Sequence, residues 1–218
     1  MTDPRVTTGQ MARSYLNLGD AQGWFEAVYA GADWDEASIP WAHLAPNPSF
    51  ADWLKHNQPV GAGRPALVIG CGLGDDAEEL ARLGFEVTAF DISATAIDWC
   101  RKRFPRSTVN YLVADLFEPV ESWQERFDFI LEAHTIQALP PPELRQQAIK
   151  AISRFVAPEG ILLITCLGAD PSSIYEGPPW PVTTAELHGF IEQGLEEIRF
   201  EDYRDQQATR RFRVEYRA

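Results

Sequence analysis

Cysteine, long apolar runs and basic side chains are all scarce in this chain of 218 residues. Its three cysteines, Cys71, Cys100 and Cys166, are odd in number and spaced unlike a zinc or disulfide pattern. We therefore expect a reducing compartment and no metal site. No stretch approaches the ~18 consecutive apolar residues of a membrane span, and residues 1–20 hold no apolar core of a secretory signal. The expected location is the cytoplasm.

Basic residues are outnumbered by acidic ones, 19 against 32, which gives a net charge of −13. Such a surface repels phosphate backbones and anionic lipid. We therefore expect neither nucleic acid nor a membrane as partner, and a small molecule as ligand. Basic residues cluster at 101–106 and 210–217. We interpret these two clusters as a helix end and a strand face.

Aromatic residues are concentrated near the N-terminus. Four of the seven tryptophans, Trp24, Trp34, Trp41 and Trp53, lie between residues 21 and 60. We expect residues 1–20 to be loosely ordered, and residues 1–60 to form an extension ahead of one domain at 61–218. Aromatic crowding favours an extension that simply packs on the sheet. The alternative is a lid over a bound ligand.

From residue 61 onward, apolar strand patterns alternate with helical ones. Strands are expected at residues 66–69, 86–90, 108–113, 127–132, 161–167, 195–203 and 210–216. Helices are expected at residues 49–56 (capped by Ser49), 75–83, 93–104, 142–156 and 183–193. The last two strands have no helix between them and must pair antiparallel. The expected fold class is α/β: a Rossmann-like three-layer sandwich with a seven-stranded, mostly parallel sheet, a C-terminal antiparallel hairpin and an N-terminal helical lid.

A glycine-rich turn follows the first of these strands. Gly70, Gly72 and Gly74 are spaced two apart, and Asp91 closes the next strand. Glycines let a ligand lie against bare backbone. A carboxylate at the end of the second strand can bind both hydroxyls of a ribose. This pattern predicts a site for a nucleotide-like ligand.

The identity of that ligand depends on the residues after the glycines. A dinucleotide site requires Gly-x-Gly-x-x-Gly, but Asp75 occupies the position of the third glycine. Asp75 and Asp76 at the start of a helix would repel a pyrophosphate and tolerate a cation. The sequence therefore disfavours an NAD-dependent oxidoreductase.

Gly-x-Gly-x-Gly followed by an acid resembles the cofactor loop of class I S-adenosylmethionine-dependent methyltransferases. The resemblance extends over residues 60–218, through the segments at 114–117, 127–132 and 139–163. It implies that Asp115 binds the exocyclic amine of adenine and that apolar neighbours flank the ring. The cofactor-binding residues implied by the resemblance are Gly70, Cys71, Gly72, Gly74, Asp76, Asp91, Ile92, Asp115, Leu116, Phe117 and Glu132.

One position departs from the family pattern. Many members carry an acid two residues before the first glycine, to bind the amino group of the cofactor, whereas this chain has Val68. Asp76, Glu132 or backbone carbonyls are the alternatives for that role. The thiopurine, halide and thiol methyltransferase branch also lacks the acid, and has tryptophans ahead of the glycine loop. That similarity implies that Trp34 and Trp41 cover the cofactor.

The implied reaction is in-line displacement of a methyl group from sulfonium onto a small-molecule acceptor, without a metal. Glu132 and His134 end the fourth strand, where a general base would lie. The alternative is that His134 only shapes its loop. Tyr175 and Trp180, in a proline-rich stretch at 175–181, are candidates for the wall of a pocket for a largely uncharged acceptor.

The acceptor atom stays open at this point. The branch similarity favours a thiol, a halide or another soft nucleophile. Methylation of oxygen, nitrogen or carbon of a metabolite is the alternative within the enzymes. A non-catalytic module that binds S-adenosylmethionine and regulates a partner is the alternative outside them.

Overall fold

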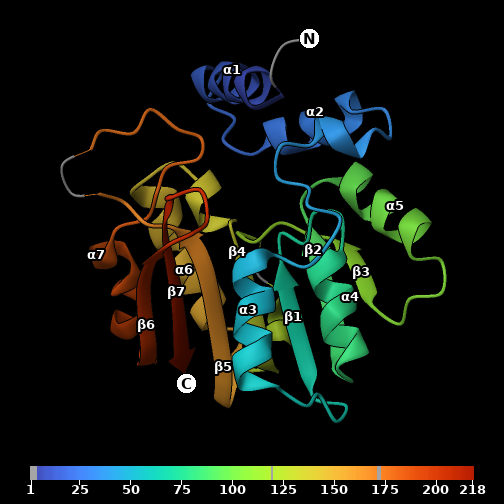
Figure 1. The fold of residues 1–218 in the computed structure, drawn as a ribbon, viewed down its shortest axis with the longest axis vertical. Coiled ribbons are helices and arrows are strands. Elements are labelled where there is room, and N and C mark those ends of the chain that lie inside the picture. Colours follow the sequence, from blue (N-terminus) through green and yellow to red (C-terminus); the bar gives the residue numbers. More distant parts are fainter. Residues whose placement is uncertain (1–3, 119, 171–172) are drawn as a thin grey trace.

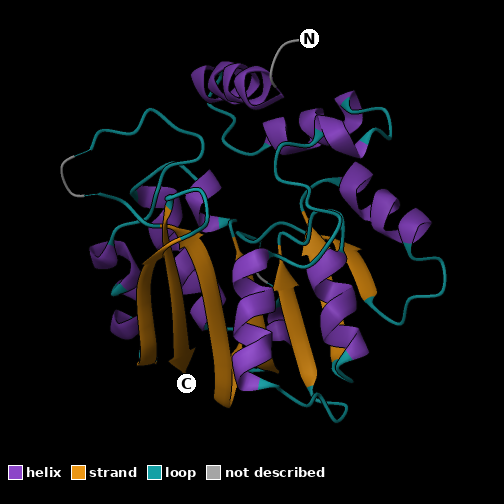
Figure 2. Ribbon diagram, viewed as in Figure 1, coloured by secondary structure: helices purple, strands orange, loops and turns teal. Residues whose placement is uncertain are grey.

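The computed structural model describes residues 4–118, 120–170 and 173–218. Helices flank a central sheet on both faces, and two further helices lie across its upper edge (Figure 1; Figure 2). The sheet has seven strands in the order β3-β2-β1-β4-β5-β7-β6. Strand β7 pairs antiparallel with both β5 and β6, and the other pairs are parallel. The predicted fold class is confirmed.

The strands lie close to the predicted ranges. They are β1 (Pro65–Ile69), β2 (Glu86–Asp91), β3 (Asn110–Val113), β4 (Phe127–Ala133), β5 (Val156–Leu167), β6 (Glu196–Arg204) and β7 (Arg210–Arg217). Strand β5 begins five residues earlier than expected, and the other boundaries shift by no more than two. The alternation of apolar and polar residues therefore located the sheet well.

The helices show more differences. They are α1 (Pro4–Asn17), α2 (Gly23–Gly31), α3 (Pro48–Asn57), α4 (Asp75–Arg82), α5 (Ala94–Arg103), α6 (Glu143–Ser153), α7 (Thr184–Leu187) and α8 (Gly189–Glu192), with 3₁₀ turns η1 (Glu36–Ser38), η2 (Glu121–Trp123) and η3 (Ile136–Ala138). The single helix predicted at 183–193 is two short ones. Helix α3 is capped by the Asn47 side chain, not by Ser49, because Asn47 accepts from the amides of Ser49 and Phe50. None of the described helices is long and apolar enough to cross a membrane.

Strand β1 shows how the core is divided. Leu67 and Ile69 belong to a cluster with helices α6, α7 and α8, whereas Ala66 and Val68 belong to one with α3, α4 and α5. Successive strand residues point to opposite faces, so one buried strand serves both layers. Its carboxyl end, and those of β2 and β4, are then directed at the same edge.

That edge is covered by α1, α2 and the segment after them, residues 4–42, which we call the cover (Figure 1). The expectation that residues 1–20 are loosely ordered is wrong for 4–17, which form α1. Helix α1 is held by packing: Ala12 is fully buried in a cluster with Trp24 and Tyr29 of α2 and Trp99 of α5. Residues 1–3 lie outside the described part.

Polar contacts anchor the cover to the sheet domain. The Glu26 carboxylate of α2 accepts hydrogen bonds from the Ser93 hydroxyl at 2.6 Å and from the Thr95 hydroxyl at 2.6 Å and amide at 3.1 Å. The Gln22 side chain donates to Asp115 Oδ1 at 3.1 Å. The cover is thereby fastened at the start of α5 and at the loop after β3.

Candidate functional site

A cavity of about 680 Å³ lies between the cover and the carboxyl ends of β1, β2 and β4. Ten predicted site residues line it: Trp41, Gly70, Cys71, Gly72, Asp76, Asp91, Ile92, Leu116, Phe117 and His134. They come from the cover and from the loops after four strands, β1, β2, β3 and β4. The fold therefore brings most of the sequence-predicted residues to one site.

The glycine loop forms the floor of this cavity. Gly70 and Gly72 have φ angles of +59° and +53°, which side chains rarely adopt. A Cβ added to Gly70 would collide with the Thr135 hydroxyl, and one added to Gly72 would lie 3.1 Å from the Tyr29 hydroxyl. The loop thus leaves room for a ligand against backbone alone.

Asp91 ties the glycine loop to the end of β2. Its Oδ2 accepts from the Gly72 amide at 2.9 Å, and its Oδ1 accepts from the Ser93 amide at 2.9 Å. Burial raises the pKa of this carboxyl to about 6, although both hydrogen bonds oppose the shift. A carboxylate oxygen has two acceptor sites, so each can still receive a ligand hydroxyl.

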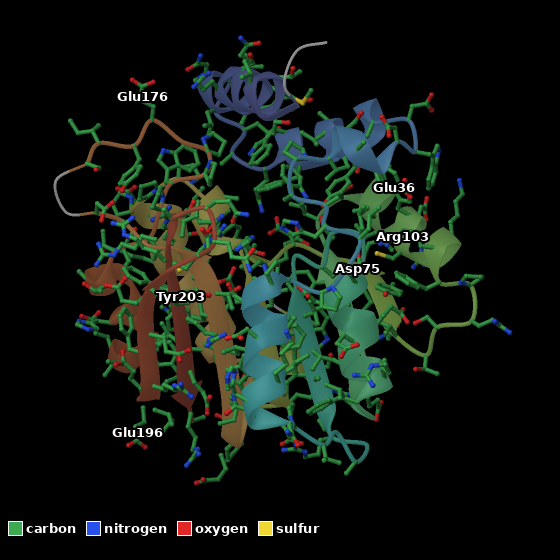
Figure 3. All side chains as sticks on the ribbon, viewed as in Figure 1. Glu36, Asp75, Arg103, Glu176, Glu196 and Tyr203 are labelled. Carbon is green, nitrogen blue, oxygen red and sulfur yellow. The ribbon has the colours of Figure 1, made fainter. Side chains whose placement is uncertain are left out.

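Asp76 is a second buried carboxyl beside the loop. The Asn47 amide donates to its Oδ1 at 2.6 Å. Burial raises its pKa to about 7. A cation placed next to Asp76 would reverse that shift, because it favours the ionised form. Asp75, by contrast, already pairs with Arg103 of α5 through two hydrogen bonds of 2.8 and 2.9 Å (Figure 3).

His134 lines the cavity at the loop after β4. Its Nε2 lies 3.3 Å from Arg211 Nη1 and 3.4 Å from Asn47 Nδ2. Both partners are donors, since the Asn47 oxygen caps α3, so Nε2 acts as an acceptor. Burial, and then the charge of Arg211 and the proximity of His43, lower the His134 pKa to about 3. The predicted base is therefore neutral, with the lone pair of Nε2 already engaged.

Glu132 lies below the cavity, not on its wall. The side chain is fully buried, and its Oε1 accepts from the amides of Thr135 at 2.6 Å and Ile136 at 2.9 Å. Its Oε2 has no partner within the described residues. Glu132 shapes the turn that presents His134 and does not line the cavity.

Three other predicted residues also lie off the cavity wall. Trp34 packs on Trp99, with Lys102 Nζ 3.1 Å from its ring centre, and does not line the cavity. Tyr175 uses its hydroxyl to accept from the Asp170 amide. Trp180 is held by its backbone, while Pro178 and Pro179 of the same loop line the cavity.

Two predicted residues support the site from behind. Gly74 is the left-handed cap of α4, with φ +89°. Asp115 accepts from the Phe117 amide at 2.9 Å as well as from Gln22, and so shapes the loop that presents Leu116 and Phe117. Neither lines the cavity in this conformation.

The prediction from sequence missed several lining residues. Tyr29 lies over Gly72 and accepts a hydrogen bond from the Trp41 indole at 2.8 Å. Asn47, Thr135 and Arg211 also line the cavity. Tyr29 was part of the aromatic-rich segment and Arg211 of a basic cluster, but neither pattern says which members reach a ligand.

Comparisons with known proteins agree with the geometry. A family model described as a methyltransferase domain matches residues 67–164. The chain is 30% identical to a probable thiol methyltransferase 2 of Arabidopsis thaliana over 78% of this chain and 74% of that protein. It is 33% identical to a ubiquinone biosynthesis O-methyltransferase of Alkalilimnicola ehrlichii, over 79% of this chain and 68% of that protein.

Solved structures share the fold. The N-methyltransferase NodS from Bradyrhizobium japonicum WM9, in complex with S-adenosyl-L-homocysteine, superposes with a TM-score of 0.68 at 20% identity, over 87% of this chain and 97% of that one. A protein from a study of the conversion of a disulfide bond into a thioacetal group during echinomycin biosynthesis gives 0.69 at 24% identity, over 88% and 89%.

The chemistry of the cavity fits a particular type of cofactor. Asp76 and Asp91 place two carboxyls beside bare glycine backbone, where a cationic ligand with a sugar finds partners and a pyrophosphate is repelled. Leu116 and Phe117 offer an apolar wall for a flat ring. A phosphate-free nucleoside that carries positive charge matches this set.

Proposed function

This chain belongs to the class I S-adenosylmethionine-dependent methyltransferases, and from that premise we propose that it methylates a small thiol or a comparable soft nucleophile, such as a halide, by in-line displacement. S-adenosylmethionine is the cofactor, and it supplies a methyl group on a positively charged sulfur. The protein has to hold the acceptor in line with that group and to exclude water, which can lower a barrier by ~7–11 kcal/mol. The cover and its aromatic side chains are suited to both tasks.

Several lining residues would hold the cofactor. Asp91 would accept from the ribose hydroxyls, and the backbone of the loop from Gly70 would pack against the ligand. Leu116 and Phe117 would flank adenine. Asp76 would pair with the ammonium group, in place of the acid that Val68 replaces, because it is the buried carboxyl at the loop without an arginine partner.

The observation that carries the choice of acceptor is the state of His134. Its pKa of about 3 and its two donor partners mean that His134 itself is not a strong base. A hydroxyl or amine acceptor profits from a base, whereas a thiol is partly ionised near neutral pH. The similarity to a probable thiol methyltransferase supports the same choice.

Methylation of oxygen is the second candidate. The similarity to ubiquinone biosynthesis O-methyltransferases favours it. Methylation of a hydroxyl profits from a general base. Asp76 lines the cavity and has a pKa of about 7, so it could act as that base if no cation is paired with it. The two candidates therefore assign Asp76 different roles.

An acceptor screen tests the proposal. Release of S-adenosyl-L-homocysteine is measured over thiols, halides, phenols and amines, for the native chain and for His134→Ala and Asp76→Asn. We expect thiols or halides to react and, with saturating cofactor, His134→Ala to keep most of the turnover number. For thiols, the pH profile should follow the pKa of each thiol.

Two outcomes would contradict this expectation. Phenol turnover with a pH profile near 7 that Asp76→Asn abolishes would establish the oxygen methyltransferase. Tight binding of S-adenosyl-L-homocysteine without turnover of any acceptor would favour a non-catalytic module.

A further inference from the structure

We propose that Arg211 is an anion-binding residue of the acceptor pocket, and that the acceptor carries a carboxylate or a similar negative group. This inference rests on the proposed function, since it concerns the acceptor of the same site. It differs from the expectation of a largely uncharged acceptor. It starts from the distribution of charge within the cavity.

Charged groups lining the cavity are separated by sign. The carboxyls are those of Asp75, Asp76 and Asp91, all at the glycine loop or the end of β2. Among the arginines and lysines that the structure describes, Arg211 alone lines the cavity, and it belongs to β7. The cofactor side therefore carries the carboxyls and the other side carries the guanidinium of Arg211, whose charge the ion pair with Asp205 offsets in part.

The hydrogen bonds of Arg211 leave part of its guanidinium available. Its Nε donates to Asp205 Oδ2 at 2.8 Å, and its Nη1 lies 3.3 Å from His134 Nε2. Its Nη2 has no hydrogen-bond partner among the described residues. Because His134 is neutral, it orients the guanidinium without cancelling its charge.

The neighbouring arginines of β7 show the contrast. Arg210 donates from Nε and Nη2 to both oxygens of Asp202, and Arg213 pairs with Glu201 and Asp52. Neither lines the cavity. Their guanidinium groups are committed to the fold, whereas the guanidinium of Arg211 faces a space large enough for a ligand. A guanidinium with a free edge is a geometrically matched partner for a carboxylate.

The turn between β6 and β7 holds Arg211 in place. Asp205 Oδ1 accepts from the amides of Gln207 and Thr209 at 3.0 Å each, while its Oδ2 holds Arg211. Gln207 and Thr209 line the cavity as well. The turn, which rises at the same edge of the sheet as the cover (Figure 1), therefore presents a charged and two polar side chains together.

The cofactor also has a carboxylate, so the source of the anion has to be decided. In the sheet order, β7 is four strands from β2, where Asp91 would hold the ribose. At a spacing of about 4.8 Å, the two backbones are roughly 19 Å apart. In the strand order Arg211 thus lies beyond β4, and its side chain reaches back to His134. The separation from the ribose partner favours the acceptor as the source. Because Asn47 contacts both His134 and Asp76, the carboxylate of the cofactor is the alternative source, and the Kd of S-adenosyl-L-homocysteine distinguishes the two.

Matched pairs of acceptors test the assignment: 2-mercaptobenzoate against benzenethiol, and salicylate against phenol. We expect the carboxylated member of a reactive pair to have a kcat/KM about 10- to 100-fold higher. Arg211→Gln should erase that ratio and leave the Kd of S-adenosyl-L-homocysteine, measured by calorimetry, within about twofold. Arg211→Lys should keep part of the ratio, because it keeps the charge.

Arg210→Gln is the matched control and should keep the native ratio. If neither pair reacts, calorimetry on the protein loaded with S-adenosyl-L-homocysteine should still show that 2-mercaptobenzoate binds to the native chain and not to Arg211→Gln. Equal use of benzenethiol and 2-mercaptobenzoate by the native chain would overturn the inference while the thiol methyltransferase stands. A weakened Kd for S-adenosyl-L-homocysteine in Arg211→Gln, with the ratio intact, would assign Arg211 to the cofactor. Failure of both anions to react or bind would also overturn it.

Discussion

The indole of Trp41 donates a hydrogen bond of 2.8 Å to the hydroxyl of Tyr29, and that hydroxyl lies directly over Gly72. The rings of the two residues also meet edge to face, with centroids 5.8 Å apart. Two aromatic residues of the cover thus form one rigid contact above the cofactor loop. Their arrangement links the tryptophan-rich segment to the predicted cofactor site.

Trp41→Phe should weaken the binding of S-adenosyl-L-homocysteine by about 3- to 10-fold, because it removes the donor that fixes Tyr29. Trp34→Phe is the matched control. Trp34 packs on Trp99 outside the cavity. The Kd of S-adenosyl-L-homocysteine for Trp34→Phe should therefore match that for the native chain. Calorimetry on both variants decides. Equal losses would mean that the cover acts through its general packing and not through the Tyr29 contact.

Asp91→Asn should weaken S-adenosyl-L-homocysteine by about 10- to 100-fold, since an amide keeps one acceptor and loses the charge that the ribose hydroxyls prefer. Asp98→Asn, on the exposed side of α5, serves as the control. Retained affinity in Asp91→Asn, in a protein that melts normally, would argue that the ligand binds elsewhere.

The affinity for S-adenosyl-L-homocysteine should fall as the pH drops from 8 to 6. The pKa of Asp76 is about 7 in the free protein, and the ammonium of the ligand favours the ionised carboxylate. Binding therefore expels a proton below pH 7, and the Kd should rise by up to about tenfold per pH unit. Calorimetry in two buffers of different ionisation enthalpy measures the released proton.

Asp76→Asn should bind more weakly at pH 8 and lose most of this dependence between pH 8 and 6. Asp91, with a pKa of about 6, contributes only at lower pH. An unchanged pH profile in Asp76→Asn would remove Asp76 from the role of ammonium partner.

Gly70→Ala should lower the free energy of unfolding by more than Gly63→Ala, by at least about 1 kcal/mol. Both glycines have positive φ, so the backbone penalty is shared. A Cβ at Gly63 meets nothing within 4 Å, whereas one at Gly70 collides with the Thr135 hydroxyl. Urea denaturation measures the difference, and Thr135→Ala should restore part of it in the double variant. Equal costs at both glycines would rule out the collision.

Much of the fold followed from the sequence, because buried parallel strands and glycine-terminated helices have strong local patterns. Helix α1 did not. Its segment shows no clear apolar stripe, with Val6 exposed and Ala12 buried, and its order comes from packing against α2. The break between α7 and α8 was also unforeseen, since the predicted helix at 183–193 gave no sign of it.

The lining residues that the sequence predicted follow strands, with the exception of Trp41 of the cover. The glycine loop, Asp91 and His134 were found because the carboxyl ends of parallel strands meet at one edge. Arg211 was not, since Arg210, Arg211 and Arg213 look alike in sequence. Which of them reaches the cavity at the glycine loop depends on where the turn at Asp205 and helix α3 place their partners.

The hydrogen bonds from the Ser93 and Thr95 hydroxyls to the Glu26 carboxylate affect the catalytic cycle. These hydroxyls follow directly after Asp91, so the cover is fastened to the very turn that would hold the sugar. If exchange of spent for fresh cofactor lifts the cover from this turn, those contacts break and re-form in every cycle. Release of the product, rather than methyl transfer, would then limit the turnover rate of such an enzyme.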